Sequence, residues 1–216
     1  DNSKTPIWSG FHPIADDLPK IISKADARKK LGWSKEKNIV LFFGLIRKYK
    51  GLDLLIEAFL KSSLKSSKTL LAIVGEPYEK KEKYVSLIHQ LKLEDRIICD
   101  FNYADRELTR DVICAADVVA QTYRSATQSG VTPLAYYYQT PILVSNLPGL
   151  KAPIEKDGTG VVTEKAPEKI ANNLYEILKE NNLLYYQKNL SQTLKNYTWQ
   201  HFCKSMLSFI NSLHES

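Results

Sequence analysis

Short apolar segments alternate with amphipathic ones along most of the chain. The apolar segments run for four to seven residues almost without interruption, which is typical of strands buried on both faces of a parallel sheet. They occupy residues 38–43, 69–75, 96–101, 117–122, 141–146 and 158–164. The segments between them repeat apolar residues at helical spacing and predict helices over 24–33, 52–63, 80–93, 105–116, 130–139 and 167–181. The pattern predicts an α/β fold, a Rossmann-like doubly wound parallel sheet with helices on both faces.

The two ends of the chain depart from this central pattern. Residues 1–14 contain an extended segment that reaches a proline, and they are predicted as a linker or strand. Residues 15–181 form the predicted sheet domain. Two further amphipathic segments predict a C-terminal helical tail, residues 182–216, whose helices pack on the domain.

Composition excludes several classes of protein. With 44% hydrophobic and 25% charged residues the chain is not disordered, and its scattered lysines, although they give a net charge of +6, form no basic and aromatic stripe of the kind that binds nucleic acid. No apolar stretch reaches the length of a membrane span. Three cysteines lack the spacing of metal ligands; Cys99 and Cys114 lie in apolar segments and are predicted to be buried. We expect a cytoplasmic protein, and peripheral contact with the inner face of a membrane stays open.

Two loops have the chemistry of a phosphate site. Open parallel sheets bind ligands beyond the carboxyl ends of their strands. After the first strand, Arg47 and Lys50 stand on a short turn between Gly44 and Gly51, so an anion is expected close to the backbone. After the fourth strand, hydroxyl and amide side chains lead into a predicted helix whose first N–H groups favour anions. These residues are Ser125, Thr127, Gln128, Ser129 and Gly130.

Better-known motifs are absent. Six residues separate Gly44 from Gly51, and no Lys-Ser or Lys-Thr follows, which excludes a Walker A loop. No Gly-x-Gly-x-x-Gly follows a strand, so a dinucleotide dehydrogenase is unsupported, and no serine nucleophile elbow is present. No Asp-x-Asp motif offers a metal site, so neither a metal nor another cofactor is expected.

An ordered set of segments resembles one known family. The segments are FFGLIRKYKGLDLLIEAF, LLAIVGEP, IICDFNYADREL, AADVVAQTY, GVTPLAYYYQTPILVSNLPGL and GTGVV, followed by YTW at the start of the last helix. Together they resemble the C-terminal, donor-binding domain of family-4 glycosyltransferases, which is one half of a GT-B fold. The resemblance covers roughly residues 7–180, and its most specific part is the loop from Gly44 to Gly51.

The resemblance implies a role for each loop. Arg47 and Lys50 would be the catalytic cations that grip the diphosphate of a nucleotide-sugar and stabilise the charge that grows as it leaves. The base and ribose would lie near four residues that follow the second and third strands, Gly75, Glu76, Asn102 and Tyr103. The enzyme would be a retaining transferase of polysaccharide biosynthesis, acting on a glycan or lipid-linked acceptor.

The sequence departs from the family at two positions. The family carries two glutamates around the helix that follows the fourth strand, and here the matching positions are Ala126 and Leu134. Two alternatives to a transferase therefore stay open: a non-catalytic module that binds a nucleotide or a partner, and half of a sugar-nucleotide epimerase. The base, the sugar, the acceptor, the linkage and the oligomeric state cannot be read from the sequence.

The acceptor-binding half of the family is absent from this sequence. The chain begins at Asp1, and its only methionine is Met206. We expect a piece of a two-domain enzyme of roughly 350–400 residues, whose N-terminal domain binds the acceptor.

Overall fold

Six parallel strands form one sheet in the computed structural model, which describes residues 5–8, 10–11, 13–65 and 68–214. The strands are β1 (Asn38–Phe43), β2 (Thr69–Val74), β3 (Ile97–Asp100), β4 (Val118–Gln121), β5 (Ile142–Ser145) and β6 (Gly160–Thr163). Their order across the sheet is β3-β2-β1-β4-β5-β6. The chain thus winds outward in both directions from the neighbours β1 and β4, which confirms the predicted doubly wound sheet.

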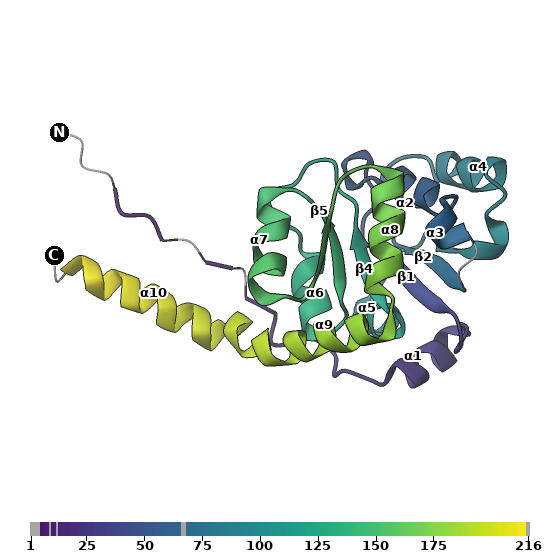
Figure 1. The fold of residues 1–216 in the computed structure, drawn as a ribbon. Coiled ribbons are helices and arrows are strands. Elements are labelled where there is room, and N and C mark those ends of the chain that lie inside the picture. Colours follow the sequence, from purple (N-terminus) through teal and green to yellow (C-terminus); the bar gives the residue numbers. More distant parts are fainter. Residues whose placement is uncertain (1–4, 9, 12, 66–67, 215–216) are drawn as a thin grey trace.

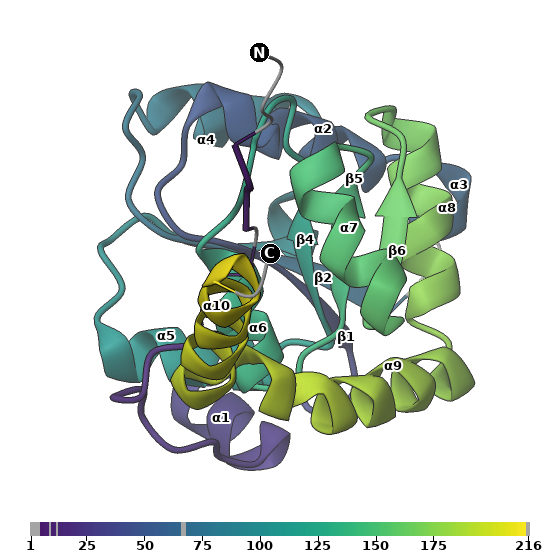
Figure 2. The same cartoon turned by 90° about the vertical axis from the view of Figure 1, so that its left-hand side faces the viewer.

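Helices cover both faces of this sheet (Figures 1 and 2). One face packs against α2 (Leu52–Ala58), α3 (Ser62–Lys65), α4 (Glu82–Gln90) and α8 (Pro167–Ile177). The other packs against α1 (Lys24–Leu31), α5 (Arg106–Ala115), α6 (Val131–Tyr137) and α7 (Pro148–Asp157). Alternate residues of β1 serve the two cores: Ile39 and Leu41 enter one, Val40 and Phe42 the other. Burial on both faces explains why these strands are hydrophobic along their whole length.

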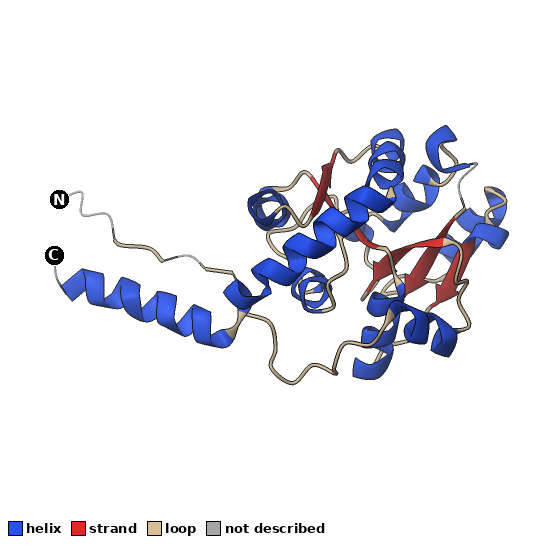
Figure 3. Cartoon of the chain, turned by 60° about the horizontal axis from the view of Figure 1, so that its bottom comes forward, coloured by secondary structure: helices blue, strands red, loops and turns tan. Residues whose placement is uncertain are grey.

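The predicted C-terminal tail is helical. It comprises α9 (Glu180–Thr193), a 3-10 turn η3 (Leu194–Tyr197) and α10 (Trp199–His214). Figures 1 and 3 show α10 projecting from the domain beside the N-terminal segment. Trp8 of that segment meets Phe202 edge to face, with ring centroids 5.0 Å apart. Residues 1–4, 9 and 12 of the predicted linker lie outside the described residues. No helix within the described part of the chain is both long and apolar enough to span a membrane.

Three expectations from the sequence need correction. The single helix predicted over 52–63 is two, because α2 ends at Ala58 and α3 begins at Ser62. Residues 148–157, to which the pattern assigned no helix, form α7. Cys114 is buried as predicted, but Cys99 is exposed. Cys99 lies on β3, the edge strand, where one side of the strand is left uncovered.

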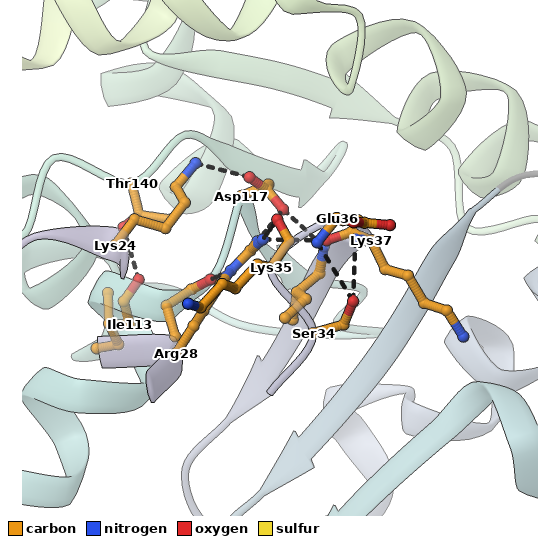
Figure 4. A network of polar contacts seen from close by, with 11 residues as sticks. Lys24, Arg28, Ser34, Lys35, Glu36, Lys37, Ile113, Asp117 and Thr140 are labelled. Atoms are coloured by element: carbon orange, nitrogen blue, oxygen red, sulfur yellow. Dashed lines mark hydrogen bonds and ion pairs between the residues drawn. The ribbon is translucent and has the colours of Figure 1, made fainter. Parts of the chain in front are cut away.

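A buried ion pair braces the amino ends of β1 and β4 (Figure 4). Asp117, directly before β4, accepts hydrogen bonds from the Ile39 backbone N–H (2.7 Å), from Arg28 Nη2 (2.7 Å) and from Lys24 Nζ (2.6 Å). Arg28 also donates to the carbonyls of Ala115, Lys35 and Lys37. Both Arg28 and Asp117 are only 5% exposed, yet these bonds satisfy them. The brace fixes α1 and the register of the two central strands.

Candidate functional site

The loops after β1 and β4 meet at the point where the direction of the strand order reverses. One crossover series runs from β1 toward β3 and the other from β4 toward β6. In such sheets the ligand crevice lies outside the carboxyl ends of the two central strands. The two loops that the sequence singled out for phosphate chemistry follow β1 and β4, and are therefore the two that flank this crevice.

Glycines shape the loop after β1. Gly44 (φ 93°) and Gly51 (φ 66°) both have left-handed backbone conformations that favour glycine. Between them, the residues from Lys48 to Lys50 form the 3-10 turn η1. A Cβ at Gly51 would overlap the carbonyl oxygen of Thr122, and the Thr122 hydroxyl donates to the Gly51 carbonyl at 3.0 Å. The turn is thus packed directly against the chain leaving β4.

Lys50 is the buried cation of the site. Its residue surface is 8% exposed, and its Nζ lies 5.6 Å from the centre of the Tyr123 ring. A Cβ placed on Gly44 would lie 3.2 Å from Lys50 Nζ and 3.7 Å from Cγ2 of Val131, the first residue of α6. The amine therefore lies close to both Gly44 and the start of α6. Burial, and then the nearby charge of Arg47, lower the pKa of Lys50 to about 8.

Arg47 takes a different position on the same turn. Its side chain is exposed, and its guanidinium lies 4.4 Å from the centre of the Tyr78 ring. The loop after β2 is joined to this turn, because Ile46 N–H donates to the Glu76 carbonyl (2.8 Å) and Tyr78 N–H to the Ile46 carbonyl (2.9 Å). The turn after β1 therefore presents one buried and one exposed cation.

Gly75 brings the second loop close to the first. Its φ is 140°, and a Cβ there would overlap the Gly44 carbonyl oxygen. Glu76, the next residue, is exposed on the same edge of the sheet. The structure thus places Gly75 and Glu76 beside the turn that carries the two cations.

Pockets lie along the loop after β4. Ser129 Oγ accepts a hydrogen bond from the Val131 N–H (3.2 Å) and lies 3.2 Å from the Tyr123 hydroxyl. It thereby satisfies one of the backbone N–H groups at the start of α6. Ser125, Thr127, Gln128 and Gly130 are exposed. A pocket of about 640 Å³ is lined by Tyr49, Arg124, Ser125, Ala126, Thr127, Gln128 and Leu147. A second, of about 380 Å³, is lined in part by Gln128, Ser129, Thr132 and Lys156. Hydroxyl and amide groups, together with the cations Arg124 and Lys156, therefore line these pockets, and Tyr49 of the cationic turn borders the larger of the two.

Asn102 and Tyr103 are the predicted site residues farthest from the switch point in the sheet order. They follow β3, at the edge of the sheet, and both are exposed, Tyr103 at 75%. Asn102 donates to Asp100 Oδ1 at 2.8 Å. Neither residue lines the two pockets named above. Their predicted contact with a base or ribose stays a prediction.

Sequence reasoning missed an ion pair that joins the two loops. Asp53, the second residue of α2, accepts hydrogen bonds from both terminal nitrogens of Arg124, at 2.7 and 2.8 Å. The two residues are 71 positions apart, so no local pattern links them. Burial raises the pKa of the Asp53 carboxyl, but the bonds and charge of Arg124 outweigh that effect and hold the pKa below its usual value. No group of three or more metal-ligating side chains gathers anywhere in the described ranges.

A comparison with protein families finds a match over most of the chain. The family model described as "Glycosyl transferases group 1" matches residues 23–198. The chain belongs to the group 1 glycosyltransferases. The family match begins before α1 and ends at the start of α10, so it includes both loops of the crevice and the braced amino ends.

Relatives and solved structures agree with the family. The D-inositol 3-phosphate glycosyltransferase of Gordonia bronchialis is 29% identical over 192 residues, which are 84% of this chain and 42% of that protein. Sucrose-phosphate synthase from Thermosynechococcus elongatus superposes with a TM-score of 0.76 at 21% identity, covering 90% of this chain and 50% of that one. Anabaena Alr3699/HepE, solved in complex with UDP and glucose, gives 0.70 at 17% identity, with 89% and 52% covered. The chain spans about half the length of the relatives it matches.

The two family positions that lack glutamate are filled by packing residues in this group 1 glycosyltransferase. Ala126 and Leu134 are half-buried and pack against the core on the α6 side of the sheet. Neither can replace a carboxylate. The groups that the two loops present at this edge are therefore cations, hydroxyls, an amide and backbone groups, without a carboxylate at either position.

Proposed function

We propose that the chain is the donor-binding half of a retaining, family-4 glycosyltransferase with a GT-B fold. The whole enzyme would move a sugar from a nucleotide-diphosphate sugar to a glycan or lipid-linked acceptor, which a further N-terminal domain would bind. The observation that carries the proposal is Lys50, a buried amine beside Gly44 and the Tyr123 ring at the switch point of the sheet. A dianionic diphosphate is the ligand that such a desolvated cation favours.

The mechanism follows from where charge develops. As the bond between sugar and diphosphate breaks, negative charge grows on the leaving phosphate oxygens. Lys50 and Arg47 present fixed positive charge there, and this charge stabilises the transition state more than the ground state. We propose that these two side chains, rather than a metal ion, perform this step. The complex of HepE with UDP and glucose supports a uridine nucleotide as the first donor class to test.

Calorimetric titration tests the proposal directly. UDP, GDP and ADP, and then their sugars, are titrated into the chain, and we expect one nucleotide to bind with a Kd between micromolar and millimolar, roughly −4 to −8 kcal/mol. Arg47→Ala should weaken binding by about 1–3 kcal/mol, because a charged hydrogen bond is lost. Lys48→Ala is the matched control, since Lys48 is an exposed cation on the same turn. Absence of binding by every nucleotide would contradict the proposal.

A non-catalytic binding module is the second candidate. The observation that favours it is the pair of apolar residues, Ala126 and Leu134, that pack where the family carries glutamates. Donor hydrolysis by the full-length protein separates the two candidates. Slow release of free sugar from the donor supports the transferase, whereas nucleotide binding without any turnover supports the module.

A further inference from the structure

The ion pair between Arg124 and Asp53 joins the two loops of the crevice. Arg124 belongs to the loop after β4, and Asp53 is the second residue of α2, directly behind the cationic turn. The guanidinium and carboxylate meet through two parallel bonds, a geometry that fixes orientation as well as distance. Each side chain is about one-third exposed, so solvent screens the pair and its contribution to folding is modest.

The same residue also holds the backbone of the turn. The Arg124 N–H donates to the Tyr49 carbonyl at 2.6 Å, and its Nη1 reaches the Lys48 carbonyl at 3.4 Å. Thr122, two residues earlier, donates to the Gly51 carbonyl. On its other side, the Arg124 carbonyl accepts Lys165 Nζ at 3.1 Å. The polar groups of Arg124 and Thr122 thus bind the turn on both sides of Lys50.

We propose that Arg124, oriented by Asp53, is a positioning residue of the diphosphate site: it holds the turn closed so that Lys50 stays buried beside Gly44 and α6. The inference rests on the proposed function of this crevice. It assigns Arg124 no contact with the diphosphate, because the guanidinium is turned toward Asp53, with which both of its terminal nitrogens bond.

The pKa of the Lys50 amine in the free chain tests this inference without any ligand. Side-chain NMR of isotope-labelled lysine gives the pKa of the Lys50 amine in the wild type and in Asp53→Asn. Loss of the Asp53 charge alone would lower this pKa, since a nearby anion disappears. If the turn opens and the amine enters water, the pKa instead rises from about 8 toward the ordinary value of 10.5. We expect the rise; an unchanged or lowered pKa overturns the inference.

Affinity for UDP supplies the second readout. Asp53→Asn and Arg124→Met should each weaken UDP binding about tenfold, and the double variant little more than either, because both remove one shared contact. Arg124→Lys keeps the charge but not the two-pronged geometry, so it should behave like Asp53→Asn. A loss of affinity in Arg124→Met with none in Asp53→Asn overturns the inference and assigns Arg124 a direct contact with UDP.

A matched control separates positioning from general stability. Lys24→Met removes a cation from Asp117 at the opposite ends of the same two strands. It should lower the melting temperature while leaving the Lys50 pKa and UDP affinity unchanged. If the wild type binds no UDP but Asp53→Asn still raises the Lys50 pKa, the proposed function fails and the positioning of Lys50 by the ion pair stands.

Discussion

Binding of a diphosphate should add a proton to Lys50. In the free chain, burial and the charge of Arg47 lower the pKa of this amine to about 8. At pH 8 about half of the amines are therefore neutral, and at pH 7 about one-tenth. A diphosphate beside the amine favours its charged form and should return the pKa to about 10 or above.

The size of the proton uptake follows from these two values. Binding should take up about half a proton at pH 8, about one-tenth at pH 7, and about 0.8 at pH 9. Affinity should fall as pH rises from about 8 toward about 10, most steeply near pH 9, where an uptake of about 0.8 proton corresponds to about sixfold per pH unit. The second ionisation of a phosphate group lies near pH 6, so the ligand itself contributes little in this range.

Calorimetry in several buffers measures the uptake. UDP is titrated into the chain at pH 7, 8 and 9 in buffers that differ in ionisation enthalpy, and the slope of heat against that enthalpy counts the protons. Lys50→Met should abolish the pH-dependent uptake, while Lys48→Met, at an exposed position of the same turn, should retain it. Equal proton counts in the wild type and Lys50→Met would refute the assignment of Lys50 to the diphosphate site.

Three further predictions concern the fold around the crevice. Because the pKa of Lys50 is lower in the folded chain than in the unfolded one, its charged form destabilises the fold below about pH 8, and this effect disappears as pH rises toward 10.5. Lys50→Met should therefore be more stable than the wild type by about 1–3 kcal/mol at pH 7, with the gap closing near pH 10.5 in urea unfolding; a gap that is constant with pH contradicts this. Asp117→Asn should reduce the free energy of unfolding by about 3–5 kcal/mol, since Arg28 is left buried and unpaired, without changing the UDP affinity of the folded chain. Gly51→Ala should cost about 2–4 kcal/mol and weaken UDP binding, because its φ is positive and a Cβ would overlap Thr122. Gly130→Ala, where a Cβ meets nothing within 4 Å, should leave stability unchanged.

The strands could be predicted because burial on both faces leaves a strong signal. All six predicted segments contain a strand of the sheet, with ends that differ by one or two residues. The helix α7 could not be predicted in the same way. Gly149 and Pro153 lower the helix propensity of its sequence, and tertiary packing of Leu150 and Ile154 overrides that preference. The exposure of Cys99 was missed because edge position depends on strand order, which the local pattern does not contain.

The site, like the fold, could be predicted only in part from the sequence. Strand-end position and glycine spacing were enough to select the two loops that flank the crevice. Nothing in the local pattern distinguishes Arg47 from Lys50, yet Arg47 lies exposed against Tyr78 and Lys50 is buried beside Gly44. The bond between Arg124 and Asp53 was also invisible, because it depends on how two distant loops meet. Roles of the predicted residues in binding a donor stay predictions until the titrations above are done.

The opposite ends of β1 and β4 have different physical tasks. At the amino ends, Arg28 and Asp117 are deeply buried and paired, and Asp117 accepts the Ile39 N–H, so the pair fixes how the two strands stand beside one another. The strands then carry that register through their ladder, Val40 opposite Val118 and Leu41 opposite Val119, toward the loops. At the carboxyl ends the joining ion pair is partly exposed, and among the described residues of the two loops the buried charge belongs to Lys50. Buried charge without a partner destabilises a fold, so its presence at only this end of the central strands is understandable if an anion completes it. Stability and ligand affinity should therefore respond to different substitutions on one pair of strands, and the contrast between Asp117→Asn and Asp53→Asn measures that separation.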